Sequence, residues 1–133
     1  MTPISITKDV DLKFGNVAVN DQIGTVVLPV SGVRSRTGGV SLPAITGVVS
    51  AAEFIVTGTE DYLFTFTLPT SATTVTNATS QTMTVDNWTS NAGTALTGGS
   101  QIVKVGATLN VGANQAAGAY LSGTGFTVTV CYN

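Results

Sequence analysis

The chain has 133 residues, of which 43% are hydrophobic and 9% are charged, and five basic against seven acidic residues give a net charge of −2. This length predicts a single domain, residues 1–133, with a hydrophobic core of its own. The low basic content excludes a typical nucleic-acid-binding surface, and no apolar run approaches the roughly 20 residues needed to span a membrane.

The first third of the chain alternates apolar and polar residues with the period of two that is typical of strands. Residues 4–14 break this alternation only at Lys8, so they predict one long strand or two strands with a kink at that point. Residues 24–31 predict the next strand, in which Pro29 indicates an edge position or a bulge. Residues 31–39, which carry both arginines, are predicted to form a loop.

The rest of the chain continues as short strands separated by turns. Residues 44–58 predict two short strands or one strand broken near Ser50–Ala51, and residues 102–111 predict two pieces on either side of Gly106. Further strands are predicted at residues 62–68, 82–86 and 125–132, a loop or poor edge strand at 70–81, a flexible loop at 89–101, and a connection with one helical turn at 112–123. Eight or nine short strands with turns between them predict an all-β sandwich or barrel.

The last predicted strand lies in the stretch GFTVTVCYN and has one of the cleanest alternations in the chain. Its two sets of side chains would point to opposite faces of a sheet. The inward set is Phe126, Val128, Val130 and Tyr132, and the outward set is Thr127, Thr129 and Cys131. Together with the other strong runs, this strand predicts a core that contains Phe14, Phe54, Phe64, Phe66, Leu109, Phe126, Val128 and Val130.

Few residues in the chain could carry chemistry. The absence of histidine excludes Ser-His-Asp triads, Cys-His pairs and histidine-based metal sites. The single cysteine, Cys131, cannot form an intrachain disulfide and has no base near it in the sequence. Asp9 and Asp11 could bind calcium, but they lack the further oxygen ligands of a calcium motif, so a solvated strand face is the favoured interpretation. We therefore expect no enzyme activity, no cofactor and no metal site.

Two further sets of residues are candidates for a site. Glu60 and Asp61 are interpreted as acidic residues at the end of a hairpin. No spacing links their carboxylates to Glu53 or Asp86 as a catalytic pair. Trp88 and Tyr62 could together form a platform on which a sugar ring stacks, although a lone tryptophan is more often a core residue. A glycan-binding module would present Trp88 or tyrosines beside polar side chains in a shallow cleft.

Three segments carry a resemblance to a known family. They are Phe14-Gly15, the block Phe54-x-Val56-Thr57-Gly58, and the stretch from Gly106-x-x-Leu109-x-Val111 to Gly118-x-Tyr120, with a penultimate Tyr132 at the end of the chain. With them, nearly the whole chain resembles an uncharacterised family of small secreted bacterial β-domains, which are similar to the fimbrial (pilin) subunits of chaperone–usher systems. The chain departs from pilins in that it cannot form their disulfide and shows no alternating extension before Thr2.

The resemblance implies an immunoglobulin-like antiparallel sandwich of about eight or nine short strands that is incomplete in the pilin manner. It also implies a secreted protein of the bacterial cell surface whose export signal has been removed. The function that follows is a non-enzymatic structural subunit of a surface fibre or related structure. Its partners would be other copies of itself or related subunits, joined by strand addition, and a periplasmic chaperone.

The resemblance also places a candidate assembly edge on the last strand. Phe126, Val128 and Val130 would form the floor of an apolar groove, and Tyr132 would close one end of it. Ile4 and Ile6 are expected at the opposite wall or swapped into a neighbouring molecule. The alternative function is a monomeric adhesin-type module that binds a glycan or a protein.

Overall fold

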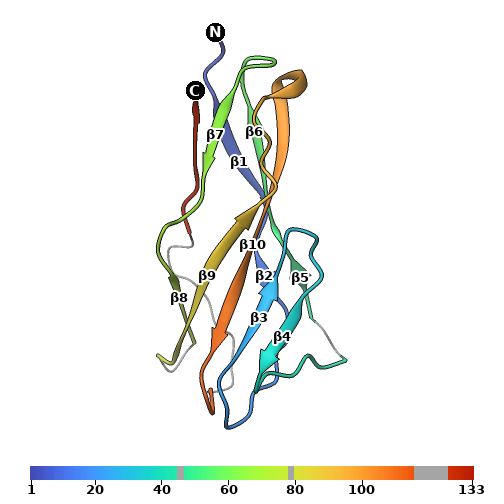
Figure 1. Ribbon diagram of the computed structural model, residues 1–133, viewed down its shortest axis with the longest axis vertical. Helices are drawn as coiled ribbons and strands as arrows, with labels where there is room; N and C mark the ends of the chain where they lie inside the picture. The colour runs from blue at the N-terminus through green and yellow to red at the C-terminus, as the bar shows by residue number, and fades with distance from the viewer. Residues whose placement is uncertain (45–46, 78–79, 116–125) are drawn as a thin grey trace.

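The computed structural model describes residues 1–44, 47–77, 80–115 and 126–133 of an elongated molecule, with both chain termini at one end (Figure 1). Apart from one 3-10 turn, η1 (Thr97–Gly99), its regular secondary structure is all β. The strands are β1 (Ser5–Val10), β2 (Lys13–Phe14), β3 (Gly24–Leu28), β4 (Ser35–Gly38), β5 (Val49–Ser50), β6 (Ala52–Thr57), β7 (Phe64–Thr67), β8 (Thr73–Thr76), β9 (Thr82–Ser90), β10 (Ser100–Val111) and β11 (Thr129–Tyr132).

One large sheet and two small ones make up the described fold, and every strand pair is antiparallel. The large sheet has the order β1-β6-β10-β3-β4, with β9 on the other edge of β10 and β8 beyond it. The small sheets are β11-β7 and β2-β5. The prediction of an all-β, antiparallel fold is confirmed, and the arrangement is consistent with a sandwich.

The long strand β10 organises the large sheet. Its first half, Ser100–Val105, pairs with β6, and its second half pairs with β3 and, on its other edge, with β9. The sequence predicted two pieces separated at Gly106, and that prediction is wrong. Gly106 continues the strand at the point where the neighbour changes from β6 to β3, because a residue without a side chain fits against the end of β3.

Other strand predictions are mostly confirmed. The kink at Lys8 is a register shift between Lys8 and Val10 in the pairing of β1 with β6. The break near residues 50–51 separates β5 from β6, and the poor edge strand in residues 70–81 is β8, which pairs only with β9 among the described residues. The predicted helical turn in residues 112–123 lies mostly outside the described residues.

Two predictions about residues 24–39 are wrong. Pro29 marks neither an edge nor a bulge but follows the end of β3, a strand that is paired on both sides. The predicted loop at residues 31–39 contains the edge strand β4, which pairs with β3 and joins its Thr37 hydroxyl to that of Thr25. Its four residues are all exposed, so no apolar periodicity announces the strand in the sequence.

The interior consists of three clusters of apolar side chains along the length of the molecule. Of the predicted core residues, Phe54, Phe64 and Leu109 are buried, whereas Phe14, Phe66, Phe126, Val128 and Val130 are half-buried. Leu96 is fully buried although it lies in the predicted flexible loop. No helix in the described part of the chain is long and apolar enough to cross a membrane.

Candidate assembly site

The last strand, β11, is paired on one side only. It runs antiparallel to β7, with Thr129 opposite Thr67 and Tyr132 opposite Phe64, and the N–H of Asn133 continues the ladder by donating to the carbonyl of Leu63 over 3.1 Å. Among the described strands, none pairs with the other side of β11. This free side is the edge that the sequence predicted as an acceptor for another strand.

The pairing with β7 fixes which backbone groups of β11 are free. In an antiparallel pair, alternate residues direct both their N–H and C=O groups at the partner strand. Because Asn133 bonds to Leu63, the backbone groups of Thr129 and Cys131 face β7. The Phe64 N–H agrees with this phase, since it points away from β11 and donates to Thr94. The backbone groups of Val130 and Tyr132 therefore point outward from the free edge.

The six residues predicted for the site lie on two neighbouring edges of the molecule. We call this set the β1–β11 seam, and all of its members are half-buried: Ile4, Ile6, Phe126, Val128, Val130 and Tyr132. The side chains of Ile4, Ile6, Val130 and Tyr132 pack against one buried cluster. Phe126 and Val128, together with Ile6, pack against the next cluster along the molecule. The seam is thus continuous with the core, and its side chains remain partly exposed.

One end of the seam is closed by a network of hydrogen bonds around Tyr132. Its hydroxyl accepts a bond from the N–H of Thr59 over 2.6 Å and donates to the carbonyl of Thr2. The N–H of Thr2 donates in turn to the Thr59 hydroxyl over 2.8 Å. A Cβ on Gly58 would overlap the Tyr132 hydroxyl, so the glycine of the Phe54-to-Gly58 block makes room for this tyrosine. Tyr132 therefore holds the two chain ends together.

The edges of the fold differ in how they discourage pairing with another chain. Natural sheets protect their edges with charged side chains and bulges. β1 has the register shift after Lys8, and Lys8 Nζ lies 2.6 Å from Asp11, where its hydrogen bond and charge keep the pKa of the Asp11 carboxyl below its usual range. β4 carries the exposed Arg36. β11 has no such protection, since residues 105–133 contain no charged side chain.

The chemically reactive side chains do not form a site. Cys131 is exposed on the outward face of β11, and Lys8 is exposed and lies 2.6 Å from Asp11 in an ion pair. Glu53 lies 3.6 Å from Lys104 in an ion pair. In the described residues there is no group of three or more His, Cys, Asp or Glu side chains that could hold a metal ion.

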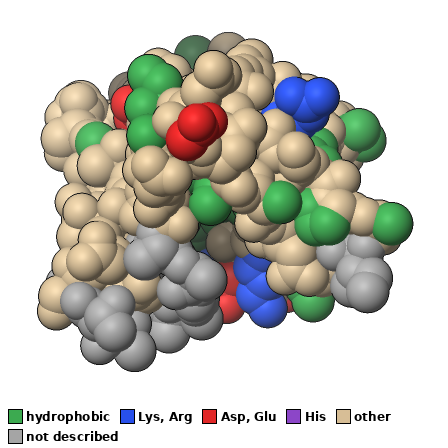
Figure 2. Space-filling model, turned by 90° about the horizontal axis from the view of Figure 1, so that it is seen from below, with side chains coloured by type: hydrophobic (Ala, Val, Ile, Leu, Met, Phe, Trp, Pro, Cys, Tyr) green, Lys and Arg blue, Asp and Glu red, His purple; other side chains and the backbone are tan. Residues whose placement is uncertain are grey.

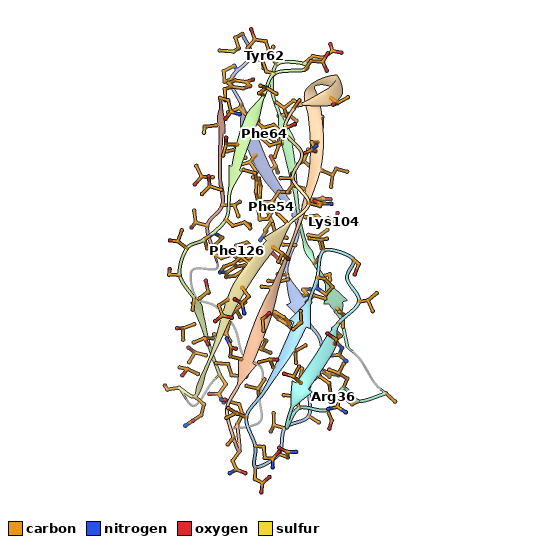
Figure 3. All side chains as sticks on the ribbon, viewed as in Figure 1. Arg36, Phe54, Tyr62, Phe64, Lys104 and Phe126 are labelled. Carbon is orange, nitrogen blue, oxygen red and sulfur yellow. The ribbon has the colours of Figure 1, made fainter. Side chains whose placement is uncertain are left out.

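The two aromatic residues considered for sugar binding are separated. Trp88 stacks on Phe126 with ring centroids 4.5 Å apart, whereas Tyr62 contacts Tyr132 at 5.7 Å. Figure 3 shows Tyr62 at the end that holds the termini and Phe126 nearer the middle of the molecule. Trp88 and Tyr62 therefore do not form a common platform, and Trp88 is used in packing, which is the interpretation that the sequence favoured.

Two shallow hollows on the described surface do not involve the seam. One, of about 410 Å³, lies beside Ile23, Gly24 and Val111, and the other, of about 440 Å³, lies beside Val33, Arg34 and Val49. Figure 2 shows the end opposite the termini, where hydrophobic side chains are scattered among polar atoms with few charges. Scattered exposed apolar residues are normal on a soluble surface and do not by themselves mark a site.

The chain belongs to a protein family described as "Domain of unknown function (DUF4402)", whose profile matches residues 4–132. No curated protein and no solved structure matches the chain. The predicted membership of an uncharacterised family is thus confirmed. The similarity to fimbrial subunits is an interpretation of the sequence.

Proposed function

We propose that this protein is a non-enzymatic structural subunit of a bacterial surface fibre or a related cell-surface structure. The observation that carries the proposal is the free edge of β11, which is unprotected by charge and borders the half-buried β1–β11 seam. An exposed edge of this kind is a template for another strand. A strand from another copy or a related subunit would add to this edge, and export to the cell surface would bring the subunits together.

Strand addition suits the chemistry of this edge in two ways. The outward N–H and C=O groups of Val130 and Tyr132 would gain partners, each bond contributing about 0.5–1.5 kcal/mol. Alternate side chains of the incoming strand would cover the seam, which supplies specificity in known cases of strand addition. The same edge would be the surface that a periplasmic chaperone protects before assembly.

The alternative function, a monomeric module that binds a glycan or a protein, has less support. A glycan-binding surface usually presents exposed aromatic rings beside polar side chains in a shallow cleft. Trp88 is engaged with Phe126, and the two hollows lie away from Tyr62. The assembly function is therefore preferred.

A lysine placed inside the seam tests the proposal. In the Val130→Lys variant the long side chain can reach solvent while the edge is open, but an added strand would bury its charge. We expect this variant to keep its fold by circular dichroism and to assemble with an affinity about 100-fold lower or more, which corresponds to about 2.7 kcal/mol. Analytical ultracentrifugation over a concentration series measures this change.

The matched control is Thr127→Lys, which adds the same charge to the same segment on its exposed, outward face. That lysine stays in solvent whether or not a strand is added, so the variant should assemble like the wild type. Equal assembly of the Val130→Lys and Thr127→Lys variants would contradict the proposal, because the contact would then lie away from the seam.

A further inference from the structure

We propose that the strand received by β11 is β11 of a second copy of this chain, related by a two-fold axis that passes beside Thr129. The result would be a continuous four-strand sheet in the order β7-β11-β11-β7. This inference rests on the proposed function in that it needs the β11 edge to accept a strand. Because a two-fold contact closes this edge, the dimer would be the building unit of the surface structure. It goes beyond that function by naming the partner, its direction and its register.

The first argument is the sequence of the edge itself. From Phe126 to Tyr132 the chain reads Phe-Thr-Val-Thr-Val-Cys-Tyr, which has the same order of residue types in both directions. An aromatic ring stands at each end, a small polar residue or cysteine follows, and valines flank a central Thr129. A two-fold antiparallel contact pairs a strand with its own reverse, so it requires this kind of self-complementarity.

The second argument is the phase of the free backbone groups. The groups of Val130 point outward. In the proposed contact the same alternation would continue into Val128, just before β11, and turn its groups outward too. Centring the contact on Thr129 places Val128 opposite Val130 of the second copy, so outward groups meet outward groups. If the register of the two strands were shifted by one residue, these outward groups would lie opposite groups already bonded to β7. Apolar side chains would then lie opposite threonines.

The third argument concerns the seam side chains that the proposed register brings together. In this register the seam faces of the two copies become continuous, and Phe126 of one copy stands opposite Tyr132 of the other. Aromatic pairs across strands add to sheet stability. Moving the axis by one residue to Val128 or Val130 also keeps apolar residues paired, but Phe126 then no longer lies opposite Tyr132 of the second copy. The register centred on Thr129 is the one that uses the whole segment.

The charges of the molecule permit this contact. Two identical edges repel each other when like charges meet, but residues 105–133 contain none. β1 is a poorer choice for self-pairing because its ladder is interrupted after Lys8, and β4 exposes Arg36. Among these edges, β11 is therefore the one that fits a second copy.

Disulfide trapping tests the register. Directly opposite residues that are not hydrogen-bonded to each other have Cα atoms about 4.5 Å apart, within the roughly 4.4–6.8 Å that a disulfide spans. In the proposed register Thr129 lies opposite itself, and Thr127 lies opposite Cys131 of the second copy. We expect the Thr129→Cys/Cys131→Ser variant and the single Thr127→Cys variant to form covalent dimers under mild oxidation.

The controls carry a single cysteine at position 131 or 127, and in the proposed register neither of these cysteines lies opposite its own copy. In wild-type protein the two Cys131 residues would be offset by about 13 Å along the strands, and the same holds for Thr127→Cys/Cys131→Ser. Both should cross-link about 10-fold more slowly or less completely than the matched variants. Circular dichroism and sedimentation of the reduced proteins show that each variant folds and self-associates.

The outcomes separate this inference from the proposed function. Covalent dimers of the two matched variants, without dimers of the two controls, support the symmetric contact. Equal cross-linking in all four proteins, or preferential cross-linking of wild-type Cys131, overturns the register. If none cross-links while Val130→Lys still abolishes assembly, the partner is a different strand, so this inference fails and strand addition stands. If Val130→Lys has no effect either, both fail.

Discussion

Replacing Phe64 with alanine is expected to lower the free energy of unfolding by about 3–5 kcal/mol. Phe64 is the first residue of β7, only 3% of it is exposed, and it lies in the buried cluster with Val56, Leu96 and Val103. Removal of the ring would leave a cavity between the large sheet and β7, against which the seam residues also pack. Urea denaturation followed by tryptophan fluorescence measures the change.

The neighbouring Leu63→Ala exchange is the control. Leu63 is 56% exposed, so its truncation should change stability by about 0.5 kcal/mol or less. If Phe64→Ala were as stable as Leu63→Ala, the inward face of β7 would be wrongly assigned. The assignment of the β11 side chains that face the core follows from its pairing with β7, so it would then also be wrong.

The second large effect is expected at Gly106. A Cβ at this position would overlap the carbonyl oxygen of Leu28 and lie 2.8 Å from the carbonyl carbon of Pro29. These are backbone atoms at the end of β3, so they cannot rotate away as a side chain would. We expect Gly106→Ala to lower the free energy of unfolding by about 3 kcal/mol, at the upper end for overpacked sites. Thermal and chemical denaturation measure the loss.

Gly93→Ala provides the comparison for Gly106→Ala. Its Cβ would meet only the end of the Gln101 side chain, which can move, and Gly93 is exposed. The change in stability should be about 0.5 kcal/mol or less. Wild-type stability in the Gly106→Ala variant would mean that β10 does not approach β3 as closely as described, and the change of partner along β10 would need another explanation.

Much of the fold could be predicted from the sequence because strand side chains alternate between a core and solvent. The alternation in residues 4–14 and 62–68 located β1, β2 and β7, and its interruption at Lys8 located the register shift. Local pattern is sufficient in these cases, since each strand has one buried face and one solvated face.

The missed elements depend on contacts that are distant in the sequence. β4 is exposed at all four positions and exists because β3 pairs with it. Gly106 was interpreted as a break because glycine weakens strands, but here it relieves a close approach of two backbones. Leu96 is buried by the strands around it rather than by a pattern of its own. Tertiary packing decided all three cases.

The candidate site was predictable in part for the same reason. The alternation of the last strand identified the inward residues of β11, and the structure places Ile4 and Ile6 against the same cluster as Val130 and Tyr132. The hydrogen bonds that join Tyr132 to Thr2 and Thr59 connect residues up to 130 positions apart, and no local pattern indicates them. The fit of Tyr132 against Gly58 suggests why a glycine stands in that block.

Hydrogen exchange at single amides in the dilute monomer tests the central claim, that β11 has an open edge, most directly. The amides of Thr129 and Cys131 face β7 and should be protected, whereas those of Val130 and Tyr132 should exchange about 10-fold faster or more. On assembly, the fast amides should become protected while the slow ones stay so. Strong and equal protection of all four amides in the monomer would contradict the account, because the edge would already be paired within one chain.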